Sequence, residues 1–404
     1  MKVACVGGGP AGLYLSILLK RQDPSHDITV LERNPAGSTY GWGVTYWGGL
    51  IDKLHGHDPE SARAIGENSI CWSDGVAHIR DRTTVHHGDE GFGIGRHRLL
   101  GILAERAVSL GVRVEFEHGI PAGAEPPAAD LVVACDGVNS TLRERHADHF
   151  GTRAVAGRNM YIWLGTTKVF DAFTFAFVET EHGWIWCYGY GFSAEHSTCV
   201  VECSAETWTG LGLHEANEAD GLAVLEKLFA EPLDGHALIG RAHEDGSARW
   251  LNFRTLTNRR WYRDNLVLLG DAAHTTHYSI GAGTTLALED AIALAGALGA
   301  ERELPSALAR YERERRSALL AVQSAARYSA QWYENLPRYT GLPPERMFAL
   351  LGQRHSPLLP HIPPGLYYRL DRAAERLDFL RGLKRRLGPR VASALHARSR
   401  ASRG

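Results

Sequence analysis

Three glycines and one acid stand close together near the start of the chain. Gly7, Gly9 and Gly12 form the pattern GxGxxG, and Glu32 follows Gly12 by twenty residues. The first glycine permits a tight turn, the second allows a pyrophosphate to approach the backbone, and the third lets a helix pack closely on a strand. The acid can take the ribose hydroxyls. This pattern predicts a dinucleotide site formed by Gly7, Gly9, Pro10, Ala11, Gly12, Glu32 and Arg33.

Two later acid–glycine turns each follow an apolar run. Asp136-Gly137 follows residues 130–135, and Gly270-Asp271 follows residues 265–269. Such turns at the carboxyl ends of parallel strands lie at the ligand crevice of a doubly wound sheet. Two glycine–acid units far apart in the sequence suit a large cofactor held at both ends better than a simple nicotinamide dehydrogenase. The further cofactor contacts that we predict are Asp136, Gly137, Gly270, Asp271, Gly281, Gly283 and Thr284.

Glycines alternate with an aromatic residue in Gly41-Trp42-Gly43-Val44. This pattern suits a backbone that runs close to a flat ligand, and it equally suits a plain turn. Arg96 begins a predicted helix and is either a surface charge or a phosphate contact. We therefore include Gly43, Val44 and Arg96 among the candidate cofactor residues.

Two side chains in the second glycine loop, His277 and Tyr278, could take part in proton transfer. Histidine is favoured as a general base because its unperturbed pKa lies near neutrality. The alternative is that His277 only fills the loop. Other histidines occur in pairs, but no third ligand stands at a useful spacing, so no metal site is predicted. These pairs are His55 with His57 and His86 with His87.

The elements that position these turns have the pattern of an α/β fold. Short apolar runs at residues 2–6, 28–31, 130–135 and 265–269 read as buried parallel strands. Amphipathic helices are expected at residues 13–20, 96–110 and 286–292, with a strand at 112–116. The order of strand, glycine turn, helix and strand predicts a Rossmann-like domain.

The middle of the chain has a different pattern. Between residues 155 and 205, alternating aromatic and β-branched runs predict an antiparallel sheet that forms a second lobe. Its aromatic residues are either core or a wall for a flat apolar substrate. The candidate substrate-binding residues are Tyr161, Trp163, Trp186, Tyr188 and His277. We expect half of the aromatic set to face away, because side chains alternate along a strand.

The chain therefore divides into three expected parts. Residues 1–150 and 250–315 form the dinucleotide-binding domain, and residues 151–249, with parts of 45–90, form the substrate-binding β-sheet domain. Residues 316–404 form C-terminal helices (about 305–335, 344–352 and 367–383) and a basic tail. That tail carries eight Arg and Lys from residue 379 onward and no acid. It is either a solvated segment or a basic surface that binds anionic phosphates.

Composition excludes several classes. The net charge is −2 and the apolar content is 44% over 404 residues, which describes a globular protein able to bury a large core. No run approaches the roughly 18 apolar residues of a membrane span. The six cysteines show no zinc-like spacing, so a reducing, cytoplasmic setting is expected. We expect neither a nucleic-acid nor a membrane partner, and a monomer or homodimer.

Taken together, these motifs resemble those of the FAD-dependent aromatic hydroxylases of the p-hydroxybenzoate hydroxylase class. Gly7–Gly12 with Glu32-Arg33, Asp136-Gly137 and Gly270-Asp271 match that class in order and spacing. Arg96 matches the arginine that reaches toward FAD. Further segments resemble a small branch that includes salicylyl-CoA 5-hydroxylase, anthraniloyl-CoA monooxygenase and an indole hydroxylase of violacein biosynthesis. These segments are Gly41–Val44, Gly157–Trp163, Val201–Ser204, Asn252–Leu256 and His277–Gly281.

The resemblance implies an FAD-binding domain and a two-step cycle. NADH or NADPH reduces FAD, the reduced flavin adds O2 to give a hydroperoxide, and the terminal oxygen passes to an electron-rich ring. The substrate would be an activated aromatic acid presented as a CoA thioester, with salicylyl-CoA first and 5-hydroxylation as the reaction. The alternative is an indole or another natural-product aromatic ring. Tyr278 replaces the usual proline of the class, and Thr285 stands where the acyl-CoA members carry lysine.

Two other functions would share the Rossmann opening. A flavin-dependent halogenase should carry a WxWxIP motif, and Trp184-Ile185-Trp186 is followed instead by Cys187-Tyr188. A flavin-linked reductase or a non-catalytic flavoprotein would differ in aerobic NAD(P)H oxidation. The sequence therefore favours a monooxygenase.

Overall fold

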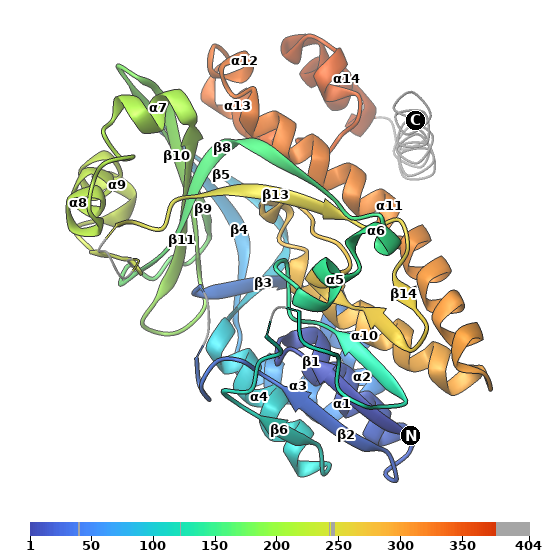
Figure 1. Cartoon of the computed structure of the whole chain (residues 1–404). Helices are drawn as coiled ribbons and strands as arrows, with labels where there is room; N and C mark the ends of the chain where they lie inside the picture. Colours follow the sequence, from blue (N-terminus) through green and yellow to red (C-terminus); the bar gives the residue numbers. More distant parts are fainter. Residues whose placement is uncertain (39–40, 122, 242, 244–246, 377–404) are drawn as a thin grey trace.

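The chain folds around two β-sheets. The computed structural model describes residues 1–38, 41–121, 123–241, 243 and 247–376. In Figure 1 the sheet of the first lobe lies below the larger sheet of the second lobe, and one long helix runs beside both. The predicted α/β class, with a Rossmann-like part and an antiparallel-sheet part, is confirmed.

The first sheet has the strand order β14-β15-β7-β1-β2-β6. Its strands are parallel except for the edge pair of β14 and β15. The central strands are mostly apolar and buried, except for the polar first residues of β1 and β2. The bounds are β1 Lys2–Val6, β2 Asp27–Leu31, β6 Arg113–Glu115, β7 Leu131–Ala134, β14 Tyr262–Arg263 and β15 Leu266–Leu268.

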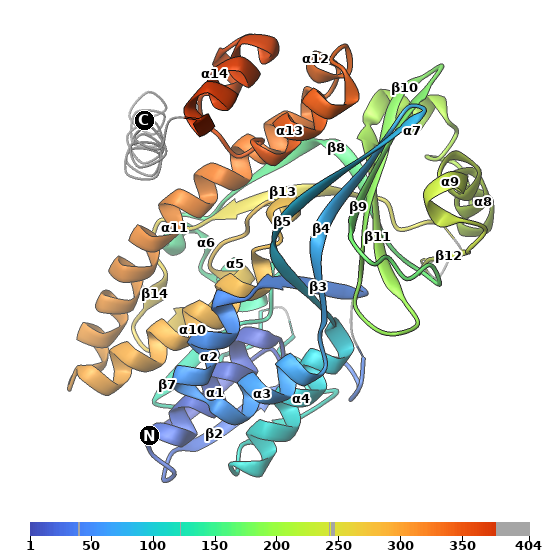
Figure 2. The same ribbon diagram turned by 180° about the vertical axis from the view of Figure 1, so that it is seen from behind.

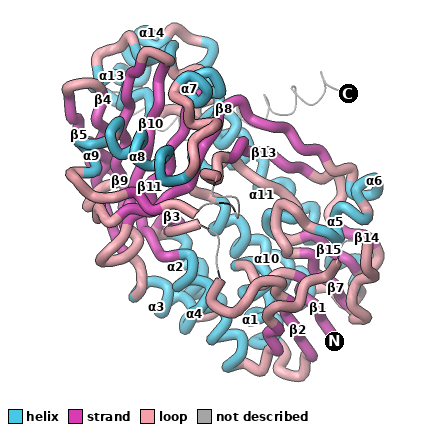
Figure 3. The backbone as a smooth tube through the Cα atoms, turned by 60° about the vertical axis from the view of Figure 1, so that its left-hand side comes forward, coloured by secondary structure: helices cyan, strands magenta, loops and turns pink. Residues whose placement is uncertain are grey.

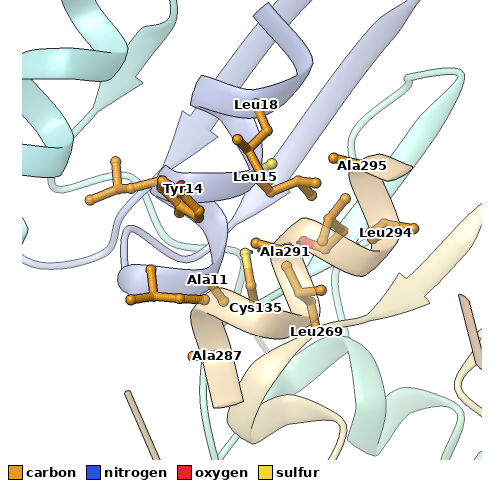
Figure 4. Close-up of a cluster of buried hydrophobic side chains, with 14 of the residues drawn as sticks. Ala11, Tyr14, Leu15, Leu18, Cys135, Leu269, Ala287, Ala291, Leu294 and Ala295 are labelled. Atoms are coloured by element: carbon orange, nitrogen blue, oxygen red, sulfur yellow. Dashed lines mark hydrogen bonds between the residues drawn. The ribbon is translucent and has the colours of Figure 1, made fainter. Parts of the chain in front are cut away.

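Helices cover one face of this sheet, as Figure 2 shows. Helix α1 (Pro10–Gln22) joins β1 to β2 and packs against α10 (Gly283–Ala300). The contact is close because Ala11, Ala287 and Ala291 are small and buried where the two helices meet (Figure 4). The other helices of this lobe are α2 Gly49–His57, α3 Pro59–Glu67, α4 Arg96–Ser109, α5 Thr141–Arg145 and α6 Ala147–Phe150.

The second sheet has the order β12-β8-β11-β10-β9-β4-β5-β3, with β13 paired to β8. Its pairs are antiparallel apart from β4 with β9. The predicted antiparallel sheet over residues 155–205 is confirmed as four strands of it. The bounds are β3 Gly43–Trp47, β4 Ile70–Ile79, β5 Arg82–Gly95, β8 Arg153–Thr166, β9 Phe173–Thr180, β10 Gly183–Gly191, β11 Ser197–Ser204, β12 Leu238–Ile239 and β13 Leu251–Thr257.

Helices lie against both faces of this second sheet (Figure 3). One face packs on α7 (Ala205–Gly210), α8 (Glu218–Leu228) and α9 (Ala230–Leu233). The other packs on α11 (Leu304–Glu334), α12 (Pro337–Thr340), α13 (Pro344–Gly352) and α14 (Pro364–Arg376). We call the second of these faces the aromatic face, because its buried residues are mostly Trp, Tyr and Phe.

The structure corrects one expected boundary. Strand β13 (Leu251–Thr257) pairs with β8, so the predicted return to the first lobe at residue 250 is too early. The reason is that residues 251–257 extend the second sheet before β14 and β15 reach the first. The helix predicted at 367–383 is observed as Pro364–Arg376, and the basic tail lies outside the described residues.

No described helix is long and apolar enough to cross a membrane. Among the described residues, no group of three or more His, Cys, Asp and Glu side chains could hold a metal ion. The six cysteines are free.

Candidate functional site

Two glycines of the first turn are required by the packing of the protein itself. Gly7 has φ +120°, and a Cβ there would lie 2.3 Å from the Cys135 carbonyl oxygen. A Cβ on Gly12 would lie 2.4 Å from the Gly7 carbonyl oxygen. These contacts bring the turn against the end of β7. Both positions therefore keep β1, α1 and β7 together whether or not a ligand is bound.

Gly9 is different, because nothing in the protein requires a glycine there. Its φ of −76° and ψ of 177° suit any residue. A Cβ at Gly9 would meet no protein atom within 4 Å. Gly9 is also the N-cap of α1, and no side chain caps this helix. The open space and the free N–H groups are those of an anion site at a helix N-terminus.

Two carboxylates flank this turn. Glu32 accepts hydrogen bonds from the Gly8 N–H at 2.7 Å and from the Asn34 N–H at 2.9 Å. Asp136 accepts one from the Thr141 N–H at 2.9 Å through Oδ2. Its Oδ1 is buried without a partner among the described residues. An unpaired buried carboxylate oxygen beside an open helix N-terminus suits a ligand with hydroxyl groups.

The second glycine unit lies against the first. Gly270 has φ +62°, and a Cβ there would lie 3.1 Å from the Ala11 Cβ. The next residue, Asp271, is exposed at its surface, yet desolvation by the surrounding protein raises the pKa of its carboxyl. The charges of His274 and Arg96 act in the opposite direction and lower that pKa. The predicted residues Arg96 and Asp271 are thus brought together. Helix α10 begins nearby at Gly283 and has no side-chain cap.

The remaining predicted cofactor residues lie around these two turns. Gly137 follows Asp136 with φ +83°, and Thr284 is half-buried at the start of α10. Gly281 approaches β3 so closely that a Cβ would lie 2.5 Å from Thr45 Oγ1. Val44 packs on the core of the first lobe, and Arg33 is exposed.

Gly43 begins β3 and packs on other segments of the second lobe. Its N–H donates to Thr198 Oγ1 at 2.8 Å, and its carbonyl accepts from the Tyr190 hydroxyl at 2.8 Å. A Cβ there would lie 2.5 Å from the Phe192 side chain. Close packing within the second lobe therefore explains this glycine, and a cofactor contact there stays a prediction.

A buried ion-pair network supports the second turn and was not identified from the sequence. Asp290 on α10 accepts from the Gly270 N–H at 3.2 Å, from His274 Nε2 at 2.8 Å and from Arg315 Nε at 2.7 Å. Although burial raises the pKa of the Asp290 carboxyl, His274 and Arg315 more than offset this and hold it below its usual value. The network fixes the turn to α10 and α11.

The first glycine turn has the free N–H donors and the open position that the pyrophosphate of FAD would need. The N-terminus of α1 and the open position at Gly9 would receive the pyrophosphate, and Glu32 would receive ribose hydroxyls. The N-terminus of α10 and the loop 277–281 would lie near the flavin end. These assignments are inferred from the geometry of the turns, and they are the ones that the sequence predicts.

The structure removes the physical reason for choosing His277 as the base. Burial, with a smaller contribution from Arg354, lowers the pKa of His277 to about 3. Its Nδ1 lies 2.8 Å from Ser279 Oγ, within the same loop. A histidine with this pKa is neutral near pH 7 and a weak proton acceptor. The near-neutral pKa of an ordinary histidine, which favoured His277 as the base, therefore does not apply to this buried side chain, and its catalytic role stays a prediction.

The predicted aromatic wall lies entirely on one face. Trp186 pairs with Glu202, and Glu202 pairs with Tyr161 on the other side. By the same register Tyr188 and Trp163 both flank Val200. Residues directly opposite share a face, so the expectation that half would point away is wrong.

The members of this wall differ in what covers them. Trp186 is stacked on Tyr333 of α11, with ring centroids 5.7 Å apart and planes at 12°. Tyr161 and Trp163 are half-buried. The Tyr161 ring lies 4.4 Å from the ring of Tyr278, which comes from the second glycine loop. Tyr278 therefore connects the loop beside α10 to the aromatic face.

Glu202 is a residue of this face that the sequence analysis missed as a functional candidate. It is 1% exposed, and burial raises the pKa of its carboxyl to about 7. Asn159, Tyr278 and Trp186 act in the opposite direction. The signal was an acid in the apolar run Thr198–Ser204, since an acid in a strand buried on both faces is unusual.

The chain was then compared with known proteins. The family described as "FAD binding domain" matches residues 86–326. A salicyloyl-CoA 5-hydroxylase of Streptomyces sp is 39% identical over 84% of this chain, which spans 66% of that protein's length. The 3-hydroxy-4-methyl-anthranilyl-[aryl-carrier protein] 5-monooxygenase of Streptosporangium sibiricum is 36% identical, over 88% of this chain and 94% of that protein.

A third relative has a name that specifies neither CoA nor a carrier protein. The protodeoxyviolaceinate monooxygenase of Chromobacterium violaceum is 31% identical, over 93% of this chain and the full length of that protein. The fold, the glycine turns and these relatives together define the class, a flavoprotein monooxygenase. The chain belongs to the FAD-dependent aromatic hydroxylases.

Proposed function

We propose that the chain uses FAD, NAD(P)H and O2 to hydroxylate an electron-rich aromatic ring that is presented as a thioester. Salicylyl-CoA, attacked at the carbon para to the hydroxyl, is the first candidate substrate. The observation that carries the proposal is the contact between Tyr278 and Tyr161 at 4.4 Å. It places a surface of aromatic rings directly beside the loop that precedes α10.

The aromatic face suits a flat apolar ring. Tyr161, Tyr188 and Tyr278 form a set of neighbouring rings, with centroids 4.4 and 6.4 Å apart for the two contacts of Tyr278. Offset and tilted rings at these distances bind a further aromatic ring favourably. A free carboxylate would be costly to bury against them. A thioester removes that charge while keeping the ring substituents that activate it.

The relatives support the thioester as the form of the substrate. Two of them have names that specify an aromatic acyl group carried on CoA or on an aryl carrier protein. The third is named for a violacein intermediate. We extend the first two names to this chain because its aromatic face consists of buried rings, against which a free carboxylate would be costly to bury. Arg354, which lies near His277, already donates to Ser329 Oγ, the Leu351 carbonyl and the Ser279 carbonyl.

The chain's own residues have three tasks in this reaction. The two uncapped helix N-termini and Glu32 would hold FAD, which supplies activated oxygen from O2 after reduction by NAD(P)H. The Asp290 network keeps the second turn in place. Helix α11 and the buried rings exclude water, which protects the reaction from side hydrolysis.

Aerobic turnover of a substrate panel tests the proposal. The panel contains salicylyl-CoA, anthraniloyl-CoA, the two free acids and indole, each with NADH and with NADPH. We expect hydroxylated thioester by mass spectrometry, with NAD(P)H consumption coupled to product. Efficient hydroxylation of the free acids, or of indole alone, would overturn the thioester claim. Product from none of the five, by a protein that retains FAD, would overturn ring hydroxylation of this substrate class.

A further inference from the structure

Glu202 is a buried acid with one unpaired oxygen. It lies on β11 and is 1% exposed. Its Oε1 accepts a hydrogen bond from Asn159 Nδ2 at 2.7 Å. Its Oε2 is buried and has no hydrogen-bond partner in the part of the chain that the structure describes. Burying an unpaired carboxylate oxygen costs free energy, and a bound ligand that donates a hydrogen bond to it would remove that cost.

The groups around Glu202 are those of a ring-binding site. Tyr161 and Trp186 stand directly opposite it on β8 and β10. The indole Nε1 of Trp186 is also buried without a partner among the described residues. The Tyr278 hydroxyl and the Trp186 indole N–H both approach the Glu202 carboxyl closely enough to lower its pKa, although neither makes a well-formed hydrogen bond to Oε2. Acceptor and donor atoms without partners thus occur together among aromatic rings, on the side of the sheet that the second glycine loop reaches.

We propose that Glu202 anchors the substrate ring. Its Oε2 accepts a hydrogen bond from the N–H or O–H substituent that activates the ring, and its charge excludes aromatic ligands with a free carboxylate. This inference rests on the proposed function and names what selects the substrate. It assigns to one residue both the preference for amine, phenol or indole donors and the rejection of free acids.

The exclusion follows from charge. Two carboxylates in a desolvated site repel each other strongly, so one of them must take a proton. A free aromatic acid would therefore bind only with a proton on Glu202. A neutral ring with an N–H or O–H donor would instead bind more tightly when Glu202 is ionised, because an ionised acceptor makes the stronger hydrogen bond.

The tyrosines and the histidine near Glu202 do not change charge around neutral pH. Burial raises the pKa of Tyr161 and Tyr333 to about 12, and those of Tyr188 and Tyr278 are raised well above the usual value for the same reason. Burial lowers the pKa of His277 to about 3. The carboxylate of Glu334 on α11 is ion-paired with Arg158 at 3.3 Å, and Arg354 is hydrogen-bonded behind the loop. A transition near pH 7 in ligand binding would therefore report Glu202.

Ligand titrations of the FAD-loaded protein test this inference. The probes are anthranilamide, a neutral ring with an amine donor, and benzoate, an anion without one. Binding is followed by the change in flavin absorbance between pH 5.5 and 8.5. We expect anthranilamide to bind several-fold more tightly above pH 7 than below it. Benzoate should weaken by about tenfold for each pH unit above the transition, because it binds only to the protonated acid.

Two variants separate Glu202 from its surroundings. In Glu202→Gln both pH dependences should flatten, and benzoate should bind at pH 8.5 more tightly than to the wild type. In Glu334→Gln, the matched control on α11, the two opposite pH dependences should remain. The wild-type measurement needs no variant, so the inference stays testable even if Glu202→Gln does not fold.

The outcomes are distinct from those of the turnover panel. Neither probe is a thioester and no product is measured, so a failed thioester assay leaves this experiment intact. Parallel or absent pH dependences for the two probes in the wild type would overturn the role of Glu202. So would unchanged opposite slopes in Glu202→Gln, or the lack of any flavin response to millimolar concentrations of either probe.

Discussion

Two buried carboxylates in this molecule have opposite surroundings. Asp290, beneath the second glycine turn, accepts hydrogen bonds from Arg315, His274 and the Gly270 N–H. Glu202, on the aromatic face, accepts one well-formed hydrogen bond, from Asn159, and its other oxygen is approached only weakly by Tyr278 and Trp186 among the described residues. Both side chains are fully buried, at 0% and 1% exposed. The pKa of Asp290 is lowered and that of Glu202 is raised to about 7.

The difference separates a structural role from a functional one. A buried charge with complete partners fixes the elements that supply them, here α10, α11 and the turn at Gly270. A buried acid without them destabilises the fold and persists only where function requires it. The Asp290 network therefore holds the second glycine turn in place, whereas Glu202 on the aromatic face keeps an oxygen that can accept a further hydrogen bond.

Removing the paired carboxylate should have the largest effect. Asp290→Ala leaves Arg315 and His274 buried without their partner, which should lower the free energy of unfolding by about 3–5 kcal/mol. Because the pKa of Asp290 is lowered, its contribution is present above the unfolded-state pKa and is lost as the pH falls through the folded-state pKa. Urea unfolding at pH 7 measures the loss.

Asp290→Asn is the matched control, since it keeps the shape and one acceptor oxygen. It should cost less than Asp290→Ala. If both variants unfold at the wild-type midpoint, the network does not hold the second turn.

Removing the charge of the unpaired carboxylate should act in the opposite direction. The folded-state pKa of Glu202 is about 7 and the model-compound value is 4.5. The protonated acid costs no stability below pH 4.5, and the free energy of unfolding then falls as the pH rises from 4.5 to about 7. At pH 8 the wild type carries a penalty of about 3 kcal/mol. Glu202→Gln should therefore be more stable than the wild type at pH 8 and nearly equal to it at pH 5.

Urea unfolding at the two pH values measures this difference. A Glu202→Gln protein less stable than the wild type at pH 8 would show that the carboxylate is satisfied in the folded state. The comparison with Asp290 would then fail.

The first glycine turn offers a third case, a space that the protein does not fill. Gly9→Val should fold normally, because its backbone suits any residue and no protein atom lies within 4 Å of the new Cβ. FAD affinity should fall by roughly 100-fold or more, about 2.8 kcal/mol, since the side chain would occupy the phosphate position.

Gly12→Val is the contrast in the same turn. Its Cβ would lie 2.4 Å from the Gly7 oxygen, so it should lower the stability of the apoprotein by about 1–3 kcal/mol or more. Thermal unfolding without FAD and FAD titration separate the two variants. A Gly9→Val protein that retains FAD would contradict the dinucleotide assignment.

The same contrast explains how much the sequence could predict. Gly7, Gly9 and Gly12 act through the backbone and lie close together in the chain, so their spacing alone predicts the turn. The parallel strands around them were predictable because each is a continuous apolar run. Sequence spacing also identified Asp136 and Asp271 at strand ends.

The aromatic face depends on register, which spacing along one strand does not give. Tyr161, Trp186 and Glu202 share a face because β8, β11 and β10 pair in one particular alignment. The low pKa of His277 depends on burial and on Arg354, 77 residues later in the chain. The position of β13 in the second sheet likewise depends on pairing with β8. Contacts between distant segments decided each of these features.

The smallest expected effect concerns one hydroxyl group. Tyr278 lowers the pKa of Glu202 through its hydroxyl, while its ring packs on Tyr161 at 4.4 Å. Tyr278→Phe keeps the ring and removes the hydroxyl, so the Glu202 carboxylate loses support and its pKa rises. A hydrogen bond contributes about 0.5–1.5 kcal/mol, which corresponds to a shift of up to about one pH unit. The midpoint of benzoate binding should therefore move upward from about 7. Tyr161→Phe, which removes a hydroxyl from the facing ring, should leave that midpoint unchanged. An equal shift in both variants would mean that the loop residue has no specific contact with the acid, and no shift in either variant would mean that burial alone sets its charge.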